Sequence, residues 1–392
     1  MPTFNPPPIH PQVAELLRDY PAEWFSDQLH QSVELVERYG LDLAIDLVLK
    51  LNVPGELRHW RSATALCHEL GFHPRFQIAL TWLLERLAEA GHLAVKSQQD
   101  KRRYRLQGEL PNAELAELRA IGLRIDPANA ATLDLLDAAA AAYPSVAKGA
   151  SGAETLFGMS QIQLWLAYFS NDNPLYALNN RLAAAAALDR VAAKPRLRIL
   201  EIGAGGGSGT QALLQALDAQ GLTGNIECYR ITEPNPFFRR RAEWEINAQF
   251  ADLPLEFGSL DMDQPWEQQG APRNGFDLVY AVNTVHVAHD LLFTLEQARQ
   301  TLAPQGWLVL GECLRPFPGK PIYTELVFQL LDSFTEVVTD PVIRPNPGFL
   351  TPEQWRNALA AAGFGETQIK PDPERMRALY TGFYTGSLAT AR

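Results

Sequence analysis

The chain has 392 residues, which exceeds the usual size of one hydrophobic core, so we expect at least two domains. Its formal net charge is −11, and this excess of acid argues against a nucleic-acid partner, because binding to phosphates requires an excess of Lys and Arg. Cys67, Cys228 and Cys313 are widely separated and odd in number, so they indicate neither a disulfide framework nor a zinc motif.

The start of the chain predicts no targeting segment. The opening sequence, MPTFNPPPIHP, lacks the basic flank and the apolar core of a signal peptide, and no apolar run approaches membrane-spanning length. We therefore expect a cytoplasmic protein that does not associate with membranes.

Residues 1–111 are predicted to form a mainly helical domain, because apolar residues recur at spacings of three and four. The predicted helices lie at 31–51, 62–70 and 75–90, and two strands lie at 92–96 and 104–106 around a polar turn at 97–103. Helices followed by a two-stranded wing are typical of a winged-helix domain. The basic residues of the wing are Lys101, Arg102, Arg103 and Arg105. Such a domain can bind DNA or pair two subunits, and the acidic chain favours pairing, as in a homodimer.

Residues 112–195 are predicted to form a helical connector or lid. The predicted helices lie at 112–142 and 174–188, with a loop at 143–151 and an apolar, aromatic stretch at 154–169 between them. Tyr176 and Asn179 lie one turn apart and share a helix face. Together with Tyr168 they are candidates to contact a substrate, although aromatic faces at helical spacing more often belong to a core.

The segment Leu197–Thr210, LRILEIGAGGGSGT, combines an apolar strand, a glycine-rich turn and the start of a helix. Glycines permit a tight turn and let a ligand approach the backbone. The acid two residues before the first glycine makes the pattern E-x-G-x-G-x-G, which resembles motif I of the class I S-adenosylmethionine-dependent methyltransferases. The residues that this resemblance assigns to S-adenosylmethionine are Glu201, Gly203, Gly205 and Gly207. A nicotinamide site, or a Glu201 that only caps a loop, are the alternatives.

Residues 196–392 alternate strands and helices, which predicts an α/β fold with the Rossmann-like sheet of a class I methyltransferase. The predicted strands lie at 197–202, 226–232, 255–260, 276–281 and 307–311, followed by a hairpin of 368–370 with 379–387. The predicted helices lie at 211–219, 234–250, 291–302, 322–337 and 351–363. Glu233 follows the second strand, where an acid binds ribose hydroxyls in such folds. By resemblance, Asp261 accepts from the adenine amino group and Met262 packs against its ring.

The stretch from Glu154 to about Phe364 resembles the C-methyltransferase domains embedded in polyketide synthases. The resemblance rests mainly on V-N-T-V-H-V-A-H-D at 282–290 and P-Q-G-W-L-V-L-G-E at 304–312. In that family a histidine and a glutamate form a catalytic dyad, which implies these roles for His286 and Glu312.

Elementary chemistry supports the same pair, because the fourth and fifth strands are neighbours and end at the same edge of the sheet. His286 would remove a proton from a carbon between two carbonyls, while Glu312 orients the imidazole. Asn283 is a further candidate for the cofactor, and His289 and Phe328 are candidates for the substrate. A metal ion held by the two histidines and Glu312 is an alternative, but the segment supplies no fixed geometry, so no metal is expected.

The expected function is methyl transfer from S-adenosylmethionine to an activated carbon of a polyketide-like or other specialised metabolite. The resemblance implies a β-ketoacyl thioester on a carrier protein as substrate. Embedded C-methyltransferases are expected to lack an N-terminal domain of this kind, so the chain is expected to be free-standing. One alternative is a small-molecule O-methyltransferase with His286 as base, whose N-terminal dimerisation domain resembles residues 1–111. The other is a DNA-binding regulator that binds S-adenosylmethionine as a ligand, which the acidic charge opposes.

Overall fold

The computed structural model describes residues 4–98, 101–379 and 385–392, which fold into two compact units. The helical unit takes its described residues from Met1–His10, Pro21–Tyr168 and Phe317–Thr335, and the sheet unit from Pro11–Tyr20, Phe169–Pro316 and Glu336–Arg392. Each unit is therefore built from segments that are far apart in the sequence. Every described helix is too short or too polar to cross a membrane.

The helical unit is organised around the long helix α2 (Asp27–Lys50). Ser26 caps its N-terminus, because the Ser26 side chain accepts from the backbone N–H of Leu29. Apolar residues at helical spacing, such as Leu43 and Leu47, are buried. Further helices are α3 (Ala63–Glu69), α4 (Gln77–Glu89), α5 (Leu115–Ile125), α6 (Ala130–Ala147), α7 (Gly152–Phe157), α8 (Ile162–Tyr168), α13 (Glu325–Phe328) and α14 (Asp332–Thr335).

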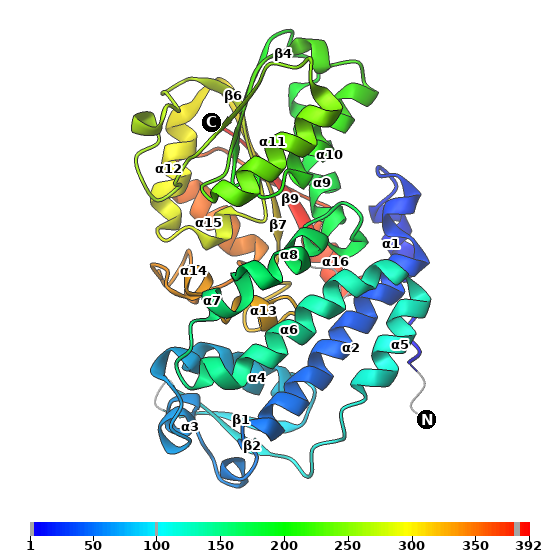
Figure 1. The fold of residues 1–392 in the computed structure, drawn as a ribbon, viewed down its shortest axis with the longest axis vertical. Helices are drawn as coiled ribbons and strands as arrows, with labels where there is room; N and C mark the ends of the chain where they lie inside the picture. Colours follow the sequence, from blue (N-terminus) through cyan, green and yellow to red (C-terminus); the bar gives the residue numbers. More distant parts are fainter. Residues whose placement is uncertain (1–3, 99–100, 380–384) are drawn as a thin grey trace. The chain divides into compact units, whose positions relative to one another are not determined.

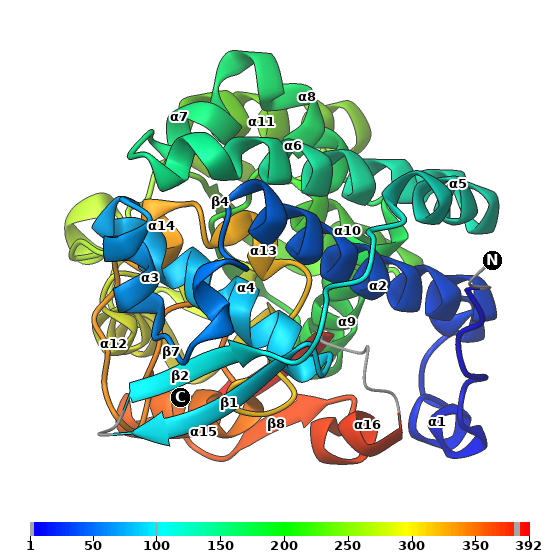
Figure 2. The ribbon, with the colours of Figure 1, turned by 90° about the horizontal axis from the view of Figure 1, so that it is seen from below.

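Two antiparallel strands, β1 (Leu93–Gln98) and β2 (Lys101–Leu106), lie beside α3 and α4 in the same unit (Figure 2). The predicted order of helices and two strands is confirmed, but the predicted turn at 97–103 is too long, because residues 97–98 and 101–103 belong to the strands. Residues 99–100 lie outside the described residues. The cations of Lys96 and Arg105 lie over the ring of Trp60, at 4.5 and 4.8 Å from its centroid. The ring therefore stabilises part of the positive charge of the wing.

Two predictions for the helical unit are wrong, because tertiary contacts override local propensity. Helix α6 continues to Ala147 where the sequence predicts a loop at 143–151, and the buried Tyr143 donates from its hydroxyl to the carbonyl of Leu326. The sequence also predicts one helix over 322–337, but the chain forms the two short helices α13 and α14. Between them Leu330 approaches Gly152 so closely that a Cβ on the glycine would lie 1.8 Å from the Leu330 carbonyl oxygen.

The sheet unit contains a seven-stranded sheet in the order β5-β4-β3-β6-β7-β9-β8. The strands β3, β4, β5, β6 and β7 run parallel to one another, and β9 is antiparallel to β7 and β8. The strand order reverses between β3 and β6, which is where ligands bind in open α/β sheets. The strands are β3 (Leu197–Ile202), β4 (Ile226–Thr232), β5 (Leu255–Gly258), β6 (Phe276–Val282), β7 (Leu302–Cys313), β8 (Thr367–Lys370) and β9 (Thr385–Ala391).

Helices cover both faces of this sheet. The helices of the sheet unit are α1 (Pro11–Leu16), α9 (Pro174–Val191), α10 (Ser208–Ala219), α11 (Pro236–Phe250), α12 (Leu291–Thr301), α15 (Pro352–Ala361) and α16 (Pro373–Leu379). In β3, Leu200 and Ile202 pack into the core beneath α12 and α15, and Ile199 packs into the core beneath α9 and α10 (Figure 1). Because both faces are covered, the strands are apolar in succession rather than alternately polar.

The predicted order of strands and helices in this unit is confirmed, with changes at their ends. β7 begins at Leu302 rather than at 307, and α10 begins at Ser208 rather than at 211. β8 and β9 pair antiparallel as the sequence predicts. However, α16 includes Leu379, the predicted first residue of the last strand, and residues 380–384 of that strand lie outside the described residues.

Gly311 in β7 lies where the sheet packs against α9, and we predict that it cannot be replaced without cost. A Cβ there would lie 2.7 Å from the Cβ of Ala183 and 3.1 Å from the carbonyl oxygen of Asn179. Gly311→Ala should therefore lower the free energy of unfolding by about 1–3 kcal/mol in urea titrations, because α9 must move. Gly224→Ala is the matched control, since a Cβ there has no atom within 4 Å. Equal stability of the two variants would contradict this packing.

Candidate active site

His286 and Glu312 are hydrogen-bonded at the carboxyl ends of two neighbouring strands. β6 and β7 are paired up to Val282 and Gly311, so the residues just beyond each strand lie close together. The Nδ1 atom of His286 lies 2.7 Å from Oε2 of Glu312, and both side chains are buried, with 4% and 0% of their surface exposed. The second carboxylate oxygen, Oε1, accepts from the backbone N–H of Val285 at 3.1 Å. The structure therefore brings the two predicted residues into contact, and their roles as base and orienting acid stay a prediction.

The surroundings of His286 restrict its orientation. The residue lies in a 3₁₀ turn, Val285–Val287, so its backbone is held together with that of the residue that donates to Glu312. The ring of Phe349 lies 4.5 Å from the imidazole, centroid to centroid, at an interplanar angle of 40°. With Nδ1 directed at a carboxylate, the other ring nitrogen, Nε2, is the atom that can exchange a proton with a substrate.

Asn283 joins β6, β7 and α9. Its Oδ1 accepts from Nδ2 of Asn179 at 2.8 Å and from the backbone N–H of Cys313 at 3.0 Å, and its own N–H donates to the carbonyl of Gly311. Burial raises the pKa of Tyr176, and hydrogen bonds to Asn283 and Ser208 oppose that shift. The structure therefore brings together three of the predicted residues, Tyr176, Asn179 and Asn283.

The glycine turn after β3 has positive φ angles at its three predicted glycines, but only one of them faces open space. A Cβ on Gly203 would lie 2.3 Å from Cγ2 of Thr284, and a Cβ on Gly207 would lie 3.2 Å from the Cβ of Ala242. Gly205, with φ of 54°, would place a Cβ with no atom within 4 Å. Gly203 and Gly207 therefore serve internal packing, and Gly205 is where a ligand can approach the backbone.

Glu233 lies directly beyond β4 and contacts this turn. Its Oε2 accepts from the N–H of Gly205 at 3.0 Å, and its Oε1 accepts from the N–H of Asn235 at 2.8 Å. Burial raises the pKa of this carboxyl, while the two backbone hydrogen bonds act in the opposite direction. The carboxylate is thus fixed beside the open side of Gly205.

Glu201 is occupied by contacts inside the unit. Its side chain is 1% exposed, and Oε2 accepts from the hydroxyls of Thr210 at 2.7 Å and Tyr229 at 2.6 Å. Burial raises its pKa to about 7, although both hydrogen bonds lower it. The predicted contact of Glu201 with a cofactor stays a prediction, and its contacts in the structure link β3, β4 and α10.

The other candidates of the sheet unit lie beyond β5 and β6. Asp261 is exposed and accepts from the N–H of Asp263 at 3.0 Å, whereas Met262 is half-buried against the core beneath α12. His289 is exposed, and its Nδ1 contacts the carbonyl oxygen of Glu336 at 2.9 Å. Among the described residues, no group of three or more His, Cys, Asp or Glu side chains is close enough to hold a metal ion.

Tyr168 and Phe328 belong to the helical unit rather than to the sheet unit. Both pack around Trp165, whose ring centroid lies 6.4 Å from that of Tyr168 and 6.0 Å from that of Phe328. Trp165 also stacks on Phe157 at 4.0 Å. The two residues are thus members of an aromatic cluster, and a contact of either with a substrate stays a prediction.

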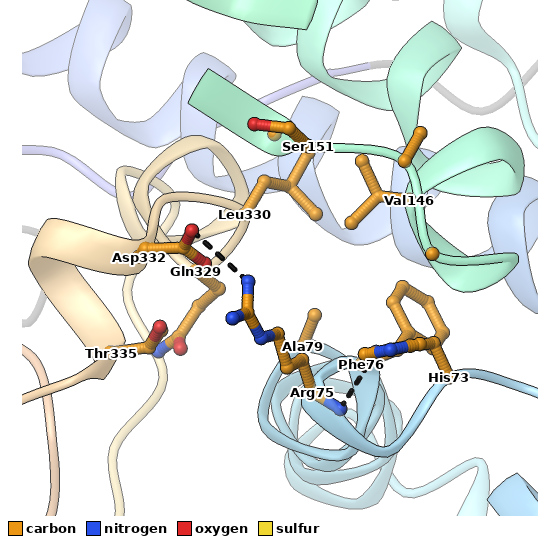
Figure 3. Close-up of a pocket in the computed structure, with 13 residues that line it drawn as sticks. His73, Arg75, Phe76, Ala79, Val146, Ser151, Gln329, Leu330, Asp332 and Thr335 are labelled. Carbon is orange, nitrogen blue, oxygen red and sulfur yellow. Dashed lines mark hydrogen bonds and ion pairs between the residues drawn. The ribbon is translucent and has the colours of Figure 1, made fainter. Parts of the chain in front are cut away.

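The helical unit also contains a pocket of about 330 Å³, formed by the start of α4, the α6–α7 connection and the α13–α14 segment (Figure 3). An exposed ion pair, Arg75 Nη1 to Asp332 at 3.2 Å, lies in it, and Phe76 and Leu330 contribute apolar surface. None of the candidate site residues lines this pocket. The sequence analysis thus assigned no role to the residues of this pocket.

Sequence reasoning missed two buried residues that contact His286, Arg344 and Phe349. Both lie in the segment VIRPNPGFL at 342–350, after β7 and far from the motifs. The prolines and glycine of this segment predict a loop, but neither spacing nor composition indicates where the loop packs.

The raised pKa of Glu201 predicts a pH dependence of stability. Because its pKa in the folded chain, about 7, exceeds the ordinary value of 4.5, its contribution is complete below pH 4.5 and is lost as the pH rises through 7. We expect the free energy of unfolding of the wild type, relative to Glu201→Gln, to fall by about 3 kcal/mol between pH 4 and pH 8. Urea titrations at a series of pH values measure this difference. A difference independent of pH would contradict the shift.

Comparison with known proteins identifies the class of domain. Residues 176–368 match the family described as a methyltransferase domain. The chain is 31% identical over 242 residues, 60% of its length, to the polyketide synthase PksR of Bacillus subtilis (strain 168). It is 30% identical over 178 residues, 45% of its length, to a highly reducing polyketide synthase of Pyrenophora dematioidea. These matches span 9% and 7% of those much longer proteins.

Solved structures share the fold over nearly the whole chain. The CurJ carbon methyltransferase has a TM-score of 0.78 and 24% identity, with 97% of this chain and 98% of that one covered. The CMeT domain of the citrinin polyketide synthase has a TM-score of 0.73 and 16% identity, with 97% and 95% covered. The trans-methyltransferase CalH, solved in complex with SAH, has a TM-score of 0.61 and 19% identity, with 93% and 92% covered.

These matches correct one expectation from the sequence. A polyketide synthase C-methyltransferase domain was expected to lack a counterpart of residues 1–111, but the shared fold covers 97% of the chain and so includes the N-terminal helices and the wing. Residues 176–368 therefore match the methyltransferase domain family, and nearly the whole chain shares the fold of the C-methyltransferase domains of polyketide synthases.

Proposed function

We propose that the chain transfers a methyl group from S-adenosylmethionine to the carbon between the two carbonyls of a β-ketoacyl thioester that is carried on a carrier protein. The observation that carries this proposal is the buried hydrogen bond between His286 Nδ1 and Glu312 Oε2, at 2.7 Å. A similar solved structure bears the name carbon methyltransferase, and the similar proteins are polyketide synthases, which supports carbon as the acceptor and a carrier-bound acyl chain.

The residues around Gly205 fit the proposed cofactor. The glycine leaves space beside its backbone, and the Glu233 carboxylate next to it can accept from vicinal hydroxyls. Oδ1 of Asn179 is buried and has no hydrogen-bond partner among the described residues, so it can accept from a bound donor group such as an ammonium. When bound, S-adenosylmethionine would supply an electrophilic methyl group. The residues proposed to contact it are Gly205, Glu233, Asp261, Met262, Asn283 and Asn179. Glu201, Gly203 and Gly207 are proposed to shape the turn that receives it.

His286 is proposed to act as the general base. Its Nε2 would take the proton from the acidic carbon, and the electron pair left there would form the bond to the methyl group as the methyl–sulfur bond breaks and S-adenosylhomocysteine leaves. Glu312 would stabilise the imidazolium through Nδ1, and burial of the pair strengthens this interaction by excluding water. Alignment of the carbon with the methyl group is the other main contribution expected from the protein.

Substitution of the base tests this proposal. We expect His286→Ala to lower kcat by about 10²–10⁴-fold, because a positioned base contributes that much, and to leave the affinity for S-adenosylhomocysteine unchanged. Turnover would be measured with a β-ketoacyl pantetheine thioester and labelled methyl donor, and the affinity by calorimetry. Glu312→Gln should give a smaller loss, since the amide orients the ring without stabilising its charge. Turnover of His286→Ala at the wild-type rate would remove the base from the proposal, and label found on oxygen would replace C-methylation by O-methylation.

Gly205 tests the cofactor site separately. We expect Gly205→Val to weaken S-adenosylhomocysteine binding at least about 100-fold, because the side chain would fill the space beside the backbone. Gly221→Val is the matched control, since Gly221 also has a positive φ, 66°, and no atom within 4 Å of a Cβ. Both variants carry similar backbone strain, but only the first should lose affinity. Normal binding by Gly205→Val would place the cofactor elsewhere.

A further inference from the structure

Arg344 is a buried cation bonded to the backbone of the proposed base. Its side chain is 1% exposed, Nη1 donates to the carbonyl of Ala288 at 2.7 Å, and Nη2 donates to the carbonyl of His286 itself. The guanidinium therefore joins the two carbonyls on either side of Val287, at the end of the 3₁₀ turn that carries the imidazole.

Within the described part of the chain, this arginine is buried without an ion pair. Asp263, Asp290 and Glu312 lie near enough to favour its charge, but no described carboxylate forms a salt bridge with it, and burial lowers its pKa to about 10. Removing a guanidinium from water is costly, and here the compensation comes from carbonyl groups of one short turn. A cation in this place is unnecessary for filling a core, since an apolar side chain would do so at lower cost.

The segment that presents Arg344 is itself fixed. The side chain of Asp340 accepts from the N–H groups of Val342 and Ile343, both at 2.8 Å, and the backbones of Asp340 and Arg344 exchange two hydrogen bonds. Phe349, five residues further on, packs on the imidazole of His286. The segment therefore contacts the base twice, on its carbonyl and on its ring.

We propose that Arg344 is a positioning residue for proton transfer: it holds the backbone carbonyls of His286 and Ala288 so that Nδ1 stays on Glu312 and Nε2 faces the substrate carbon. This inference rests on the proposed role of His286 as base. The two contacts have different roles. Glu312 fixes the imidazole ring through Nδ1, and Arg344 fixes the backbone from which the ring extends.

The test separates proton removal from cofactor binding. Arg344→Met, Arg344→Lys and His286→Ala would be compared in deuterium exchange of the acidic carbon of a β-ketoacyl pantetheine thioester, above the enzyme-free rate and with S-adenosylhomocysteine bound. Arg299→Met is the matched control, because Arg299 also donates to a carbonyl, that of Ala362, but at the end of α15. Thermal unfolding and calorimetry with S-adenosylhomocysteine would accompany each variant.

We expect Arg344→Met to lower the exchange rate and kcat about 100-fold, since small displacements of a reacting group have effects of that size, with KM and S-adenosylhomocysteine affinity nearly unchanged. Arg344→Lys, which keeps the charge but lacks the planar fork of donors, should recover part of the rate, and exchange by Arg299→Met should equal that of the wild type. Wild-type exchange by a folded Arg344→Met overturns the inference, as does failure of both Arg344 variants to fold, which would make the arginine a stability element. If His286→Ala catalyses deuterium exchange at the wild-type rate, the proposed base is wrong. This outcome distinguishes a failure of the proposed base from a failure of the role proposed for Arg344.

Discussion

The carboxyl ends of β6 and β7 must lie side by side for His286 to reach Glu312, and the architecture of the sheet unit follows from this requirement. The strands are in parallel register up to Val282 and Gly311, and α9 packs so closely on β7 that residue 311 has room for no side chain. This close packing brings Asn179 of α9 within hydrogen-bond distance of Asn283, which follows β6. A buried carboxylate such as Glu312 is tolerated only where donors are provided, and here the turn after β6 provides both of them.

Buried glutamates that accept hydrogen bonds lie at the ends of three strands. Glu201 at the end of β3, Glu233 beyond β4 and Glu312 in β7 each accept two hydrogen bonds from groups within the sheet unit. Buried acids with satisfied oxygens are rigid, so they fix the loops that would surround a ligand. Asn179 differs from them, because its buried carbonyl oxygen has no partner among the described residues. A rigid site with one unsatisfied acceptor is suited to a polar ligand group.

Glycines that look alike in the sequence have different structural roles. Gly203 and Gly207 are required because Thr284 and Ala242 leave no space for a side chain, whereas Gly205 faces open space. Only the second situation is favourable for ligand approach. Similarly, the segment at 340–350 has the composition of a surface loop, yet it buries Arg344 and Phe349 against His286. Contacts of this kind depend on where a loop returns to the fold.

Local periodicity and spacing determined the order of strands and helices and the glycine turn, because these follow from nearby residues. The pairing of His286 with Glu312 came from the resemblance to C-methyltransferase domains, supported by the rule that parallel strands end at one edge. Tertiary structure alone decided what lies far along the chain: the helical unit that holds Tyr168 and Phe328, the breaking of the 322–337 helix near Gly152, and the contact of Arg344 with His286. The physical reason is that burial and hydrogen bonding between distant segments outweigh local propensity, whereas a sequence pattern reflects only the propensity of neighbouring residues.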